Sequence, residues 1–248
     1  MSKERTAERS DLHGQTALVT GAGRGIGKAI ALALGAAGAH VVPAARSEGE
    51  IRAVADEIKA AGGQATPLRL DVAQESEILG VFKQIQQRFG RLDMLVNNAG
   101  IGLYGPVRDF RTDDLDKLLG VNLRGAFLCC REALRLMEPR RSGYIINISS
   151  VVGFKAYVNQ AAYTATKHGL VGLTKTLAQE AQPHGIRVSI ISPGGVDTDL
   201  VRAARPDLDP SVLLQPDDIA QTVMYLLSLP DRAAVDEIYI RRRVSQPF

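Results

Sequence analysis

The amino-acid sequence predicts an α/β protein in which a doubly wound parallel sheet of about seven strands is covered by helices on both faces. Short apolar segments alternate with longer segments of helical periodicity along almost all of the 248 residues. Alternation of this kind is typical of parallel sheets between two helical layers, because each crossover helix lies on a face of the sheet. No linker, repeat or low-complexity segment divides the chain. We therefore expect one domain over residues 1–248, with residues 1–12 as a flexible tail.

Seven apolar segments are short enough to be buried strands, and they lie at residues 15–20, 39–45, 64–71, 92–97, 144–149, 187–191 and 237–240. Pro43 is in conflict with the second of these assignments. A buried parallel strand uses the backbone N–H that proline lacks. We expect a bulge or an early end of the strand near Pro43.

The segments between the strands show helical spacing, and they lie at residues 25–38, 48–61, 76–89, 113–138 (one or two helices), 161–181 and 217–229. In residues 48–61, for example, Ile51, Val54 and Ile58 fall on one face. Residues 29–45 are the most apolar stretch, but glycines, a histidine and Pro43 interrupt it. A helix followed by a buried strand explains this stretch better than a membrane span does.

Composition excludes several other classes of protein. The net charge of +3 and the absence of Trp give no basic stripe with aromatic residues, so we expect no nucleic-acid partner. The four His are scattered, which argues against a metal site. Cys129 and Cys130 are adjacent, so they form a poor disulfide framework and fit a reducing cytoplasm as packing residues. The N-terminus is charged and has no apolar signal-peptide core.

A glycine-rich turn joins the first strand to the first helix, and it reads Thr20-Gly21-Ala22-Gly23-Arg24-Gly25-Ile26-Gly27. Glycines let the backbone approach a pyrophosphate, and the free N–H groups of the helix N-terminus attract its negative charge. A turn with this content, placed after the first strand, is typical of a Rossmann-type dinucleotide site.

The end of the second strand indicates which dinucleotide binds. NAD sites usually carry Asp or Glu there to bind the ribose hydroxyls, whereas this chain has Ala45, Arg46 and Ser47. Arg46 and Arg24 could together clamp a 2′-phosphate. The sequence therefore predicts a preference for NADP(H) over NAD(H); the alternative is that one or both arginines are only solvated.

Tyr163 and Lys167 lie four residues apart in the expected helix 161–181, so they share one face. The strand before this helix ends at Ser149 and Ser150, at the sheet edge where ligands of open α/β sheets bind. On these motifs the chain resembles the short-chain dehydrogenase/reductase family, in its single-domain, 3-oxoacyl-carrier-protein reductase-like branch. The matching pieces span nearly the whole chain and are the glycine turn, Asp71-Val72, Asn97-Asn98-Ala99-Gly100, Asn122, Ser150, Tyr163, Lys167, Pro193-Gly194 and Thr198.

The resemblance implies a catalytic role for four residues. Tyr163 would donate a proton to the substrate carbonyl, and Lys167 would lower the pKa of this phenol and bind the nicotinamide ribose. Ser150, rather than Ser149, would hydrogen-bond the carbonyl oxygen. Asn122 would position a water that relays protons toward Lys167.

The resemblance also implies a set of cofactor-binding residues. Asp71 would bind the adenine amino group, and Asn97 would either lie beside the ribose or only tie strands together. The full set is Gly21, Gly23, Arg24, Gly25, Ile26, Gly27, Arg46, Ser47, Asp71, Val72, Asn98, Ala99, Gly100, Tyr163, Lys167, Pro193, Gly194, Val196 and Thr198.

Substrate and assembly are less well defined by the sequence. Residues 199–215 are expected to form a short substrate lid. The arginine pair at 140–141 and the arginine triplet at 241–243 could each dock an acidic acyl carrier protein; the alternative is that they are solvated ends of elements. A general carbonyl reductase or a sugar or polyol dehydrogenase remains an alternative, and a non-catalytic cofactor-binding regulator is disfavoured because Tyr163 and Lys167 are both present. The long helices 113–138 and 161–181 are expected to pair in a homodimer or homotetramer. The C-terminus lacks the Gly-Gly that is common in the family.

Overall fold

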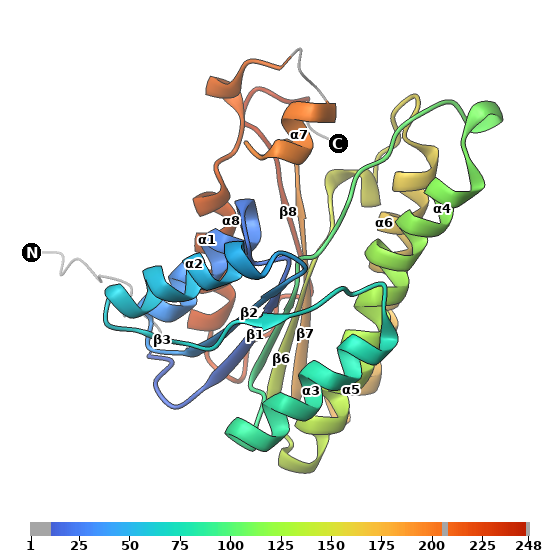
Figure 1. The fold of residues 1–248 in the computed structure, drawn as a ribbon. Helices are drawn as coiled ribbons and strands as arrows, with labels where there is room; N and C mark the ends of the chain where they lie inside the picture. Colours follow the sequence, from blue (N-terminus) through green and yellow to red (C-terminus); the bar gives the residue numbers. More distant parts are fainter. Residues whose placement is uncertain (1–10, 205–207, 247–248) are drawn as a thin grey trace, which may run out of the picture.

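The computed structural model describes residues 11–204 and 208–246, and it shows one continuous parallel sheet between two helical layers (Figure 1). The strands are arranged in the order β3-β2-β1-β5-β6-β7-β8, and β4 also pairs with β2. All pairs are parallel, which confirms the predicted fold class. The order reverses between β1 and β5, and this is where a doubly wound sheet binds its ligand.

The strands are β1 (Thr16–Thr20), β2 (His40–Ala45), β3 (Gln64–Ala65), β4 (Leu68–Arg69), β5 (Met94–Asn97), β6 (Gly143–Ile148), β7 (Ile186–Pro193) and β8 (Glu237–Ile240). The helices are α1 (Gly25–Ala36), α2 (Glu48–Ala60), α3 (Glu75–Phe89), α4 (Thr112–Leu119), α5 (Ala126–Met137), α6 (Ala161–Ala181), α7 (Asp199–Ala204) and α8 (Pro216–Ser228). A π-helical turn, η2 (Gly120–Gly125), joins α4 to α5, so the helix predicted at 113–138 is one long helix with a widened turn in its middle.

The bulge or early strand end expected at Pro43 is wrong. β2 continues to Ala45, and Pro43 pairs in register with Val19 of β1. The carbonyls of Val41 and Ala45 accept hydrogen bonds from the N–H groups of residues 66 and 70 in the adjacent segment 64–70. Pro43 lies between Val41 and Ala45, so its backbone nitrogen faces the same segment. This adjacent segment is not a strand at Pro67, between the end of β3 and the start of β4. The missing N–H therefore faces a gap in the sheet and leaves no partner unsatisfied.

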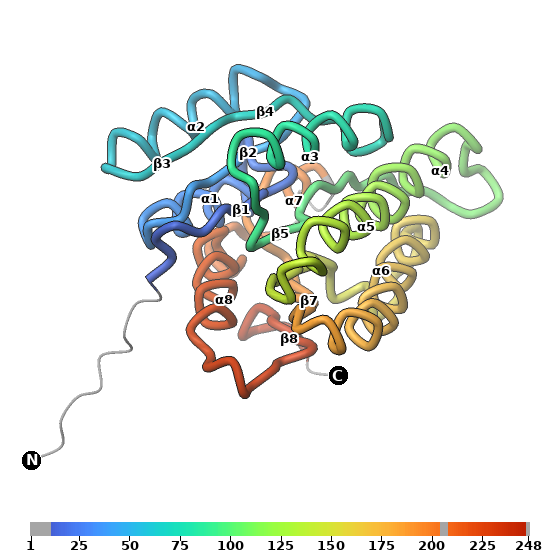
Figure 2. The backbone as a smooth tube through the Cα atoms, turned by 90° about the horizontal axis from the view of Figure 1, so that it is seen from below, coloured from blue at the N-terminus to red at the C-terminus, as the bar shows by residue number. Residues whose placement is uncertain are grey.

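Two apolar clusters hold the helices on opposite faces of the sheet. One contains α1, α2 and α8, with residues such as Ile30, Val54 and Val223. The other contains α3, α5 and α6, with residues such as Ile85 and Leu177. Seen along the sheet, α1 lies beside α8 on one side and α5 beside α6 on the other (Figure 2).

The N-terminal boundary of the domain differs from the prediction. Residues 1–10 of the expected tail lie outside the described residues, but Leu12 is buried and its N–H donates to the carbonyl of Ala37. Residue 12 therefore belongs to the domain. Cys129 and Cys130 are free and buried in the packing role that was predicted. Over residues 11–204 and 208–246, no helix combines the length and apolarity needed to cross a membrane, and no cluster of potential metal ligands is found.

Candidate active site

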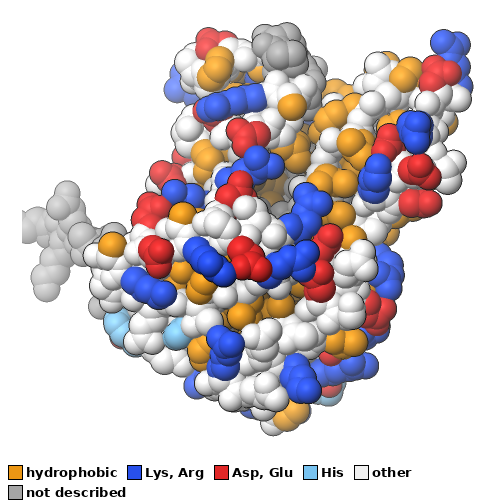
Figure 3. All heavy atoms as spheres, viewed as in Figure 1, with side chains coloured by type: hydrophobic (Ala, Val, Ile, Leu, Met, Phe, Trp, Pro, Cys, Tyr) orange, Lys and Arg blue, Asp and Glu red, His pale blue; other side chains and the backbone are white. Residues whose placement is uncertain are grey.

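A cleft of about 1110 Å³ lies at the carboxyl edge of the sheet, where the strand order reverses. Figure 3 shows the hollow between the α7 segment and the side that carries α4 and α6, with hydrophobic side chains on its walls. Of the catalytic and cofactor-binding residues predicted from the sequence, all except Gly27 and Asn122 line this cleft. Predicted residues from Gly21 to Thr198 thus converge on one site, as the motifs indicated.

The glycine turn is shaped for close approach of a ligand. Gly21 has φ of +65°, and a Cβ there would lie 2.8 Å from Cα of Ala99. Gly27 lies behind the turn, where a Cβ would collide with the carbonyl of Gly21, so it serves helix packing rather than ligand contact. The N-terminus of α1 has no side-chain cap, which leaves its first N–H groups available to an anion.

Asn98 fixes this turn to the end of β5. Its side-chain amide donates to the carbonyls of Thr20 and Gly21, at 3.0 and 3.2 Å. In return, the hydroxyl of Thr20 accepts from the N–H groups of Asn98 and Ala99, both at 3.0 Å. Asn97 points the other way and donates to Asn147 of β6, so it takes the strand-tying role that the sequence left open.

Tyr163, Lys167 and Ser150 meet at the inner end of the cleft. Tyr163 and Lys167 are buried on one face of α6, and the Lys167 ammonium lies 5.8 Å from the centre of the Tyr163 ring. The Ser150 side chain lies close enough to the Tyr163 phenol to oppose the rise in its pKa. Ser149, in contrast, is turned inward and donates to the carbonyl of Lys167. The serine selected from the sequence is therefore the one that faces the phenol.

Burial dominates the titration of this pair. Desolvation raises the pKa of Tyr163 above its usual value, and the nearby Tyr104 ring adds to the effect while Ser150 opposes it. Desolvation also lowers the pKa of Lys167 from 10.5 to about 8. Both effects disfavour charge in a dry site. The lowering of the phenol pKa that the family resemblance implies stays a prediction for the cofactor-bound protein.

Asn122 lies in the π-helical turn and is only 1% exposed. Its side-chain oxygen accepts from the N–H of Ile101 at 2.9 Å, and its amide donates to the Ile101 carbonyl at 2.9 Å and to Thr166 at 3.3 Å. The side chain is thus fully used in holding the loop after β5 against α6. A water relay at this position, which stays a prediction, would have to use the main-chain carbonyl that a π-turn can leave free.

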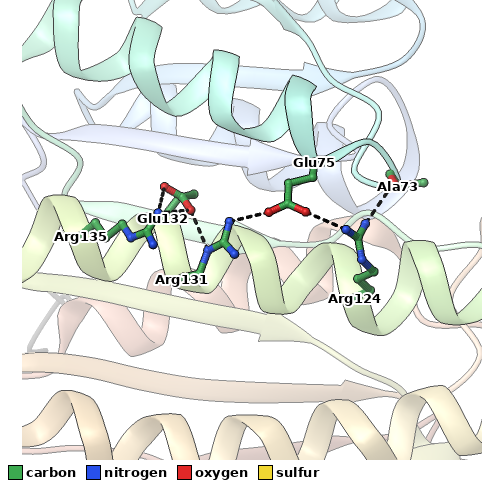
Figure 4. Close-up of polar contacts among 6 residues, drawn as sticks. All are labelled: Ala73, Glu75, Arg124, Arg131, Glu132 and Arg135. Atoms are coloured by element: carbon green, nitrogen blue, oxygen red, sulfur yellow. Dashed lines mark hydrogen bonds and ion pairs between the residues drawn. The ribbon is translucent and has the colours of Figure 1, made fainter.

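An ion-pair network joins the π-turn to the segment that carries Asp71 and Val72 (Figure 4). Arg124 of η2 donates to the carbonyl of Ala73 at 3.4 Å and to the carboxylate of Glu75 at 2.8 Å. Arg131 of α5 donates to the other Glu75 oxygen at 2.9 Å and to the Glu132 carboxylate. Arg135 completes the chain of contacts on Glu132. The network thus connects the helix that bears Asn122 to the part of the cleft lined by Asp71 and Val72.

Three residues of the cleft region were missed from the sequence. Glu50 and Asp199 line the cleft near Arg24, and Tyr104 packs edge-on against Tyr163 with ring centres 5.6 Å apart. Glu50 belongs to the first turn of α2, and Asp199 begins the segment 199–215 that was expected to form a substrate lid. Nothing in the local pattern of these residues distinguishes them from surface residues, because the tertiary fold brings them to the site.

Comparison with known proteins agrees with this geometry. The family model described as short chain dehydrogenase matches residues 15–209. The chain belongs to this family. As a short-chain dehydrogenase it is an oxidoreductase that interconverts CH–OH and C=O groups.

Individual relatives resemble this short-chain dehydrogenase over nearly its full length. A 3-oxoacyl-[acyl-carrier-protein] reductase from Synechocystis sp. is 40% identical over 230 residues, which are 90% of this chain and 93% of the relative. A metagenomic short-chain oxidoreductase, solved in complex with NADP, has a TM-score of 0.84 at 39% identity and covers 95% of this chain and 100% of its own. A putative gluconate dehydrogenase from Agrobacterium tumefaciens has a TM-score of 0.88 at 33% identity, covering 93% and 96%.

Proposed function

We propose that this short-chain dehydrogenase uses NADP(H) to reduce a 3-oxoacyl thioester carried on an acyl carrier protein. The observation that carries the proposal is the 40% identity to a 3-oxoacyl-[acyl-carrier-protein] reductase over 90% of the chain. The walls of the cleft support it, because Ile101 and Leu103 pack in one apolar cluster with Tyr163. Leu200 and Val201 add apolar lining to the same cleft, which suits an acyl chain.

The residues at the outer part of the cleft fit a dinucleotide. The glycine turn and the uncapped N-terminus of α1 present N–H groups to the pyrophosphate, and Arg24, Arg46 and Ser47 line the region of the 2′-phosphate. Asp71 lines the adenine end, although one of its oxygens accepts from the N–H of Ala73. When bound, the cofactor supplies the hydride.

The protein supplies the proton and the orientation of the carbonyl. Ser150 donates a hydrogen bond to the substrate oxygen and holds it beside Tyr163. Tyr163 donates its proton to that oxygen as the carbon accepts hydride, which balances the reduction of the ketone to the alcohol. Lys167 then stabilises the phenolate by its positive charge, and its Nζ is held by the Ile148 carbonyl at 3.1 Å.

The two basic clusters differ in their distance from this chemistry. Arg140 and Arg141 precede β6, at the opposite end of that strand from Ser150, and they donate to Asp93 and to the carbonyl of Pro183. Residues 241–243 follow β8 at the carboxyl edge, and the N–H of Gly194 in the cleft wall donates to the carbonyl of Ile240. Of the two clusters on the same chain, residues 241–243 lie at the edge of the sheet that carries the cleft. We therefore propose residues 241–243 as the docking surface for an acidic carrier protein.

A polyol or sugar-acid dehydrogenase is the second candidate, and the likeness to a putative gluconate dehydrogenase favours it. The two functions separate in a direct assay. Initial rates with NADPH should be compared for acetoacetyl-carrier protein, acetoacetyl-coenzyme A, simple ketones, quinones and 5-keto-gluconate. The proposal requires the highest kcat/KM with the carrier-bound thioester, and a higher value with the sugar acid would overturn it.

We also propose a homotetramer in a reducing cytoplasm. Phe127 of α5 is 51% exposed and Leu119 at the end of α4 is 37% exposed, so the helices expected to pair across a twofold axis present apolar side chains. The two free cysteines fit a reducing compartment. Analytical ultracentrifugation tests the assembly, and a monomer at micromolar concentration would contradict it.

A further inference from the structure

The charges around the 2′-phosphate region are more balanced than the two arginines alone indicate. Arg24 and Arg46 line the cleft there, but so do the carboxylates of Glu50 and Asp199. Arg24 lies 3.0 Å from the Asp199 carboxylate, in an ion pair that is mostly exposed on both sides. One of the two expected guanidinium groups is thus already shared with an acid of the α7 segment. Basic and acidic side chains also alternate around the rim of the hollow in Figure 3.

Glu50 has a fixed place against the glycine turn. A Cβ on Gly23 would lie 2.6 Å from its carboxylate oxygen Oε2 and 2.9 Å from its Cβ, so the side chain fills the space that Gly23 leaves open. The N–H of Glu50 donates to the Ser47 hydroxyl, which caps α2 and fixes the start of this helix. Across residues 11–204 and 208–246, no cation forms an ion pair with the Glu50 carboxylate.

This position matters because of what each cofactor presents there. In NAD sites an acid at the end of the second strand accepts hydrogen bonds from the ribose hydroxyls. Here that strand ends without an acid, but Glu50 brings a carboxylate to the same cleft from the first turn of the next helix. A 2′-phosphate, in contrast, carries negative charge that a carboxylate without a counterion repels.

We propose that Glu50 is a specificity-determining residue that restrains the preference for NADP(H), so that the protein also binds NAD(H). The inference rests on the proposed use of NADP(H). The two arginines attract the 2′-phosphate, and the Glu50 carboxylate repels it. The ratio of the affinities for NADP(H) and NAD(H) therefore depends on the attraction by the arginines less the repulsion by Glu50. Removing the Glu50 charge therefore shifts the protein toward NADP(H).

The test measures binding directly, by calorimetric titration of the full chain with NADP⁺ and with NAD⁺ at low ionic strength. In Glu50→Gln, we expect the ratio of the NAD⁺ to the NADP⁺ dissociation constant to rise about 3- to 10-fold, the size expected for removing one nearby charge in a partly solvated site. The increase should shrink at high salt, because the charges are open to solvent.

Glu48→Gln is the matched control. Glu48 lies in the same first turn of α2, but it pairs with Arg52 at 2.6 Å and does not line the cleft. Its substitution removes the same formal charge and should leave the ratio within a factor of about 1.5 of the wild-type value, because Arg52 already balances the Glu48 carboxylate and this residue lies outside the cleft lining. An unchanged ratio in Glu50→Gln, or an equal rise in Glu48→Gln, would overturn the inference.

The proposed cofactor and the role of Glu50 fail in different ways. If the wild-type protein does not bind NADP⁺ at all, the proposed function falls. If it binds NADP⁺ and the ratio of the two dissociation constants is the same in Glu50→Gln as in the wild type, only the specificity role of Glu50 falls. NAD⁺ binding by Glu50→Gln shows in the same titration that the variant is folded, and titration with 2′,5′-ADP against 5′-AMP repeats the comparison without the nicotinamide half.

Discussion

Lys167 should lower the stability of the folded protein, and its replacement by Met should therefore stabilise it. Burial lowers the pKa of this ammonium from 10.5 to about 8. That difference corresponds to a penalty of about 3 kcal/mol on the charged form at pH 7. We expect Lys167→Met to be more stable than wild type by up to about 3 kcal/mol at pH 7 while being inactive.

The pH dependence identifies the cause. Below about pH 8 the lysine is charged in both the folded and the unfolded chain, so the wild-type protein bears the full penalty. Between about pH 8 and 10.5 the folded chain has released this proton and the unfolded chain has not. The free energy of unfolding of the wild type should rise over that range, and the advantage of Lys167→Met should shrink toward zero by about pH 10.

Urea unfolding of both proteins at pH 7 and pH 10, at one protein concentration, measures the two differences. Lys175→Met on the same helix is the control, since Lys175 is exposed and its replacement should change little at either pH. A Lys167→Met protein that is less stable than wild type at pH 7, or an advantage that persists undiminished at pH 10, would refute the reasoning.

Three further substitutions test separate parts of the site. Tyr163→Phe should lower kcat by about 10²–10⁴-fold, because the proton donor is lost, while NADP⁺ titration shows unchanged affinity; retention of half the rate would contradict this role. Asn122→Ala should cost about 1–3 kcal/mol in urea unfolding, because the partly buried N–H of Ile101 loses its acceptor, and a loss below about 0.5 kcal/mol would argue against that bond. Arg124→Ala should raise the cofactor KM about 2- to 5-fold with kcat unchanged, since its partly exposed pair with Glu75 holds the adenine segment. Partial rescue in Arg124→Lys would separate charge from packing, and an unaltered KM would refute the link.

Local patterns predicted the features that local physics controls. The glycine turn and the i,i+4 pair of Tyr163 and Lys167 follow from spacing that a strand or helix converts directly into position. The single strand expected at 64–71 is split at Pro67 into β3 and β4, and this gap explains why Pro43 is tolerated opposite it. The uses of Asn122 and Ser149 were not predictable, because their partners lie in segments whose approach only the tertiary fold defines.

Cofactor preference shows why a site needs more than its motif residues. The sequence placed Arg24 and Arg46 together because both lie in segments of known relation to the ribose. Glu50 reaches the same space from the next helix, and Asp199 from 175 residues further along the chain than Arg24. Binding of a phosphate depends on the sum of these charges rather than on the cations alone. Two positive groups in a motif therefore predict where a 2′-phosphate would lie, whereas the carboxylates that the fold adds determine how strongly it is preferred.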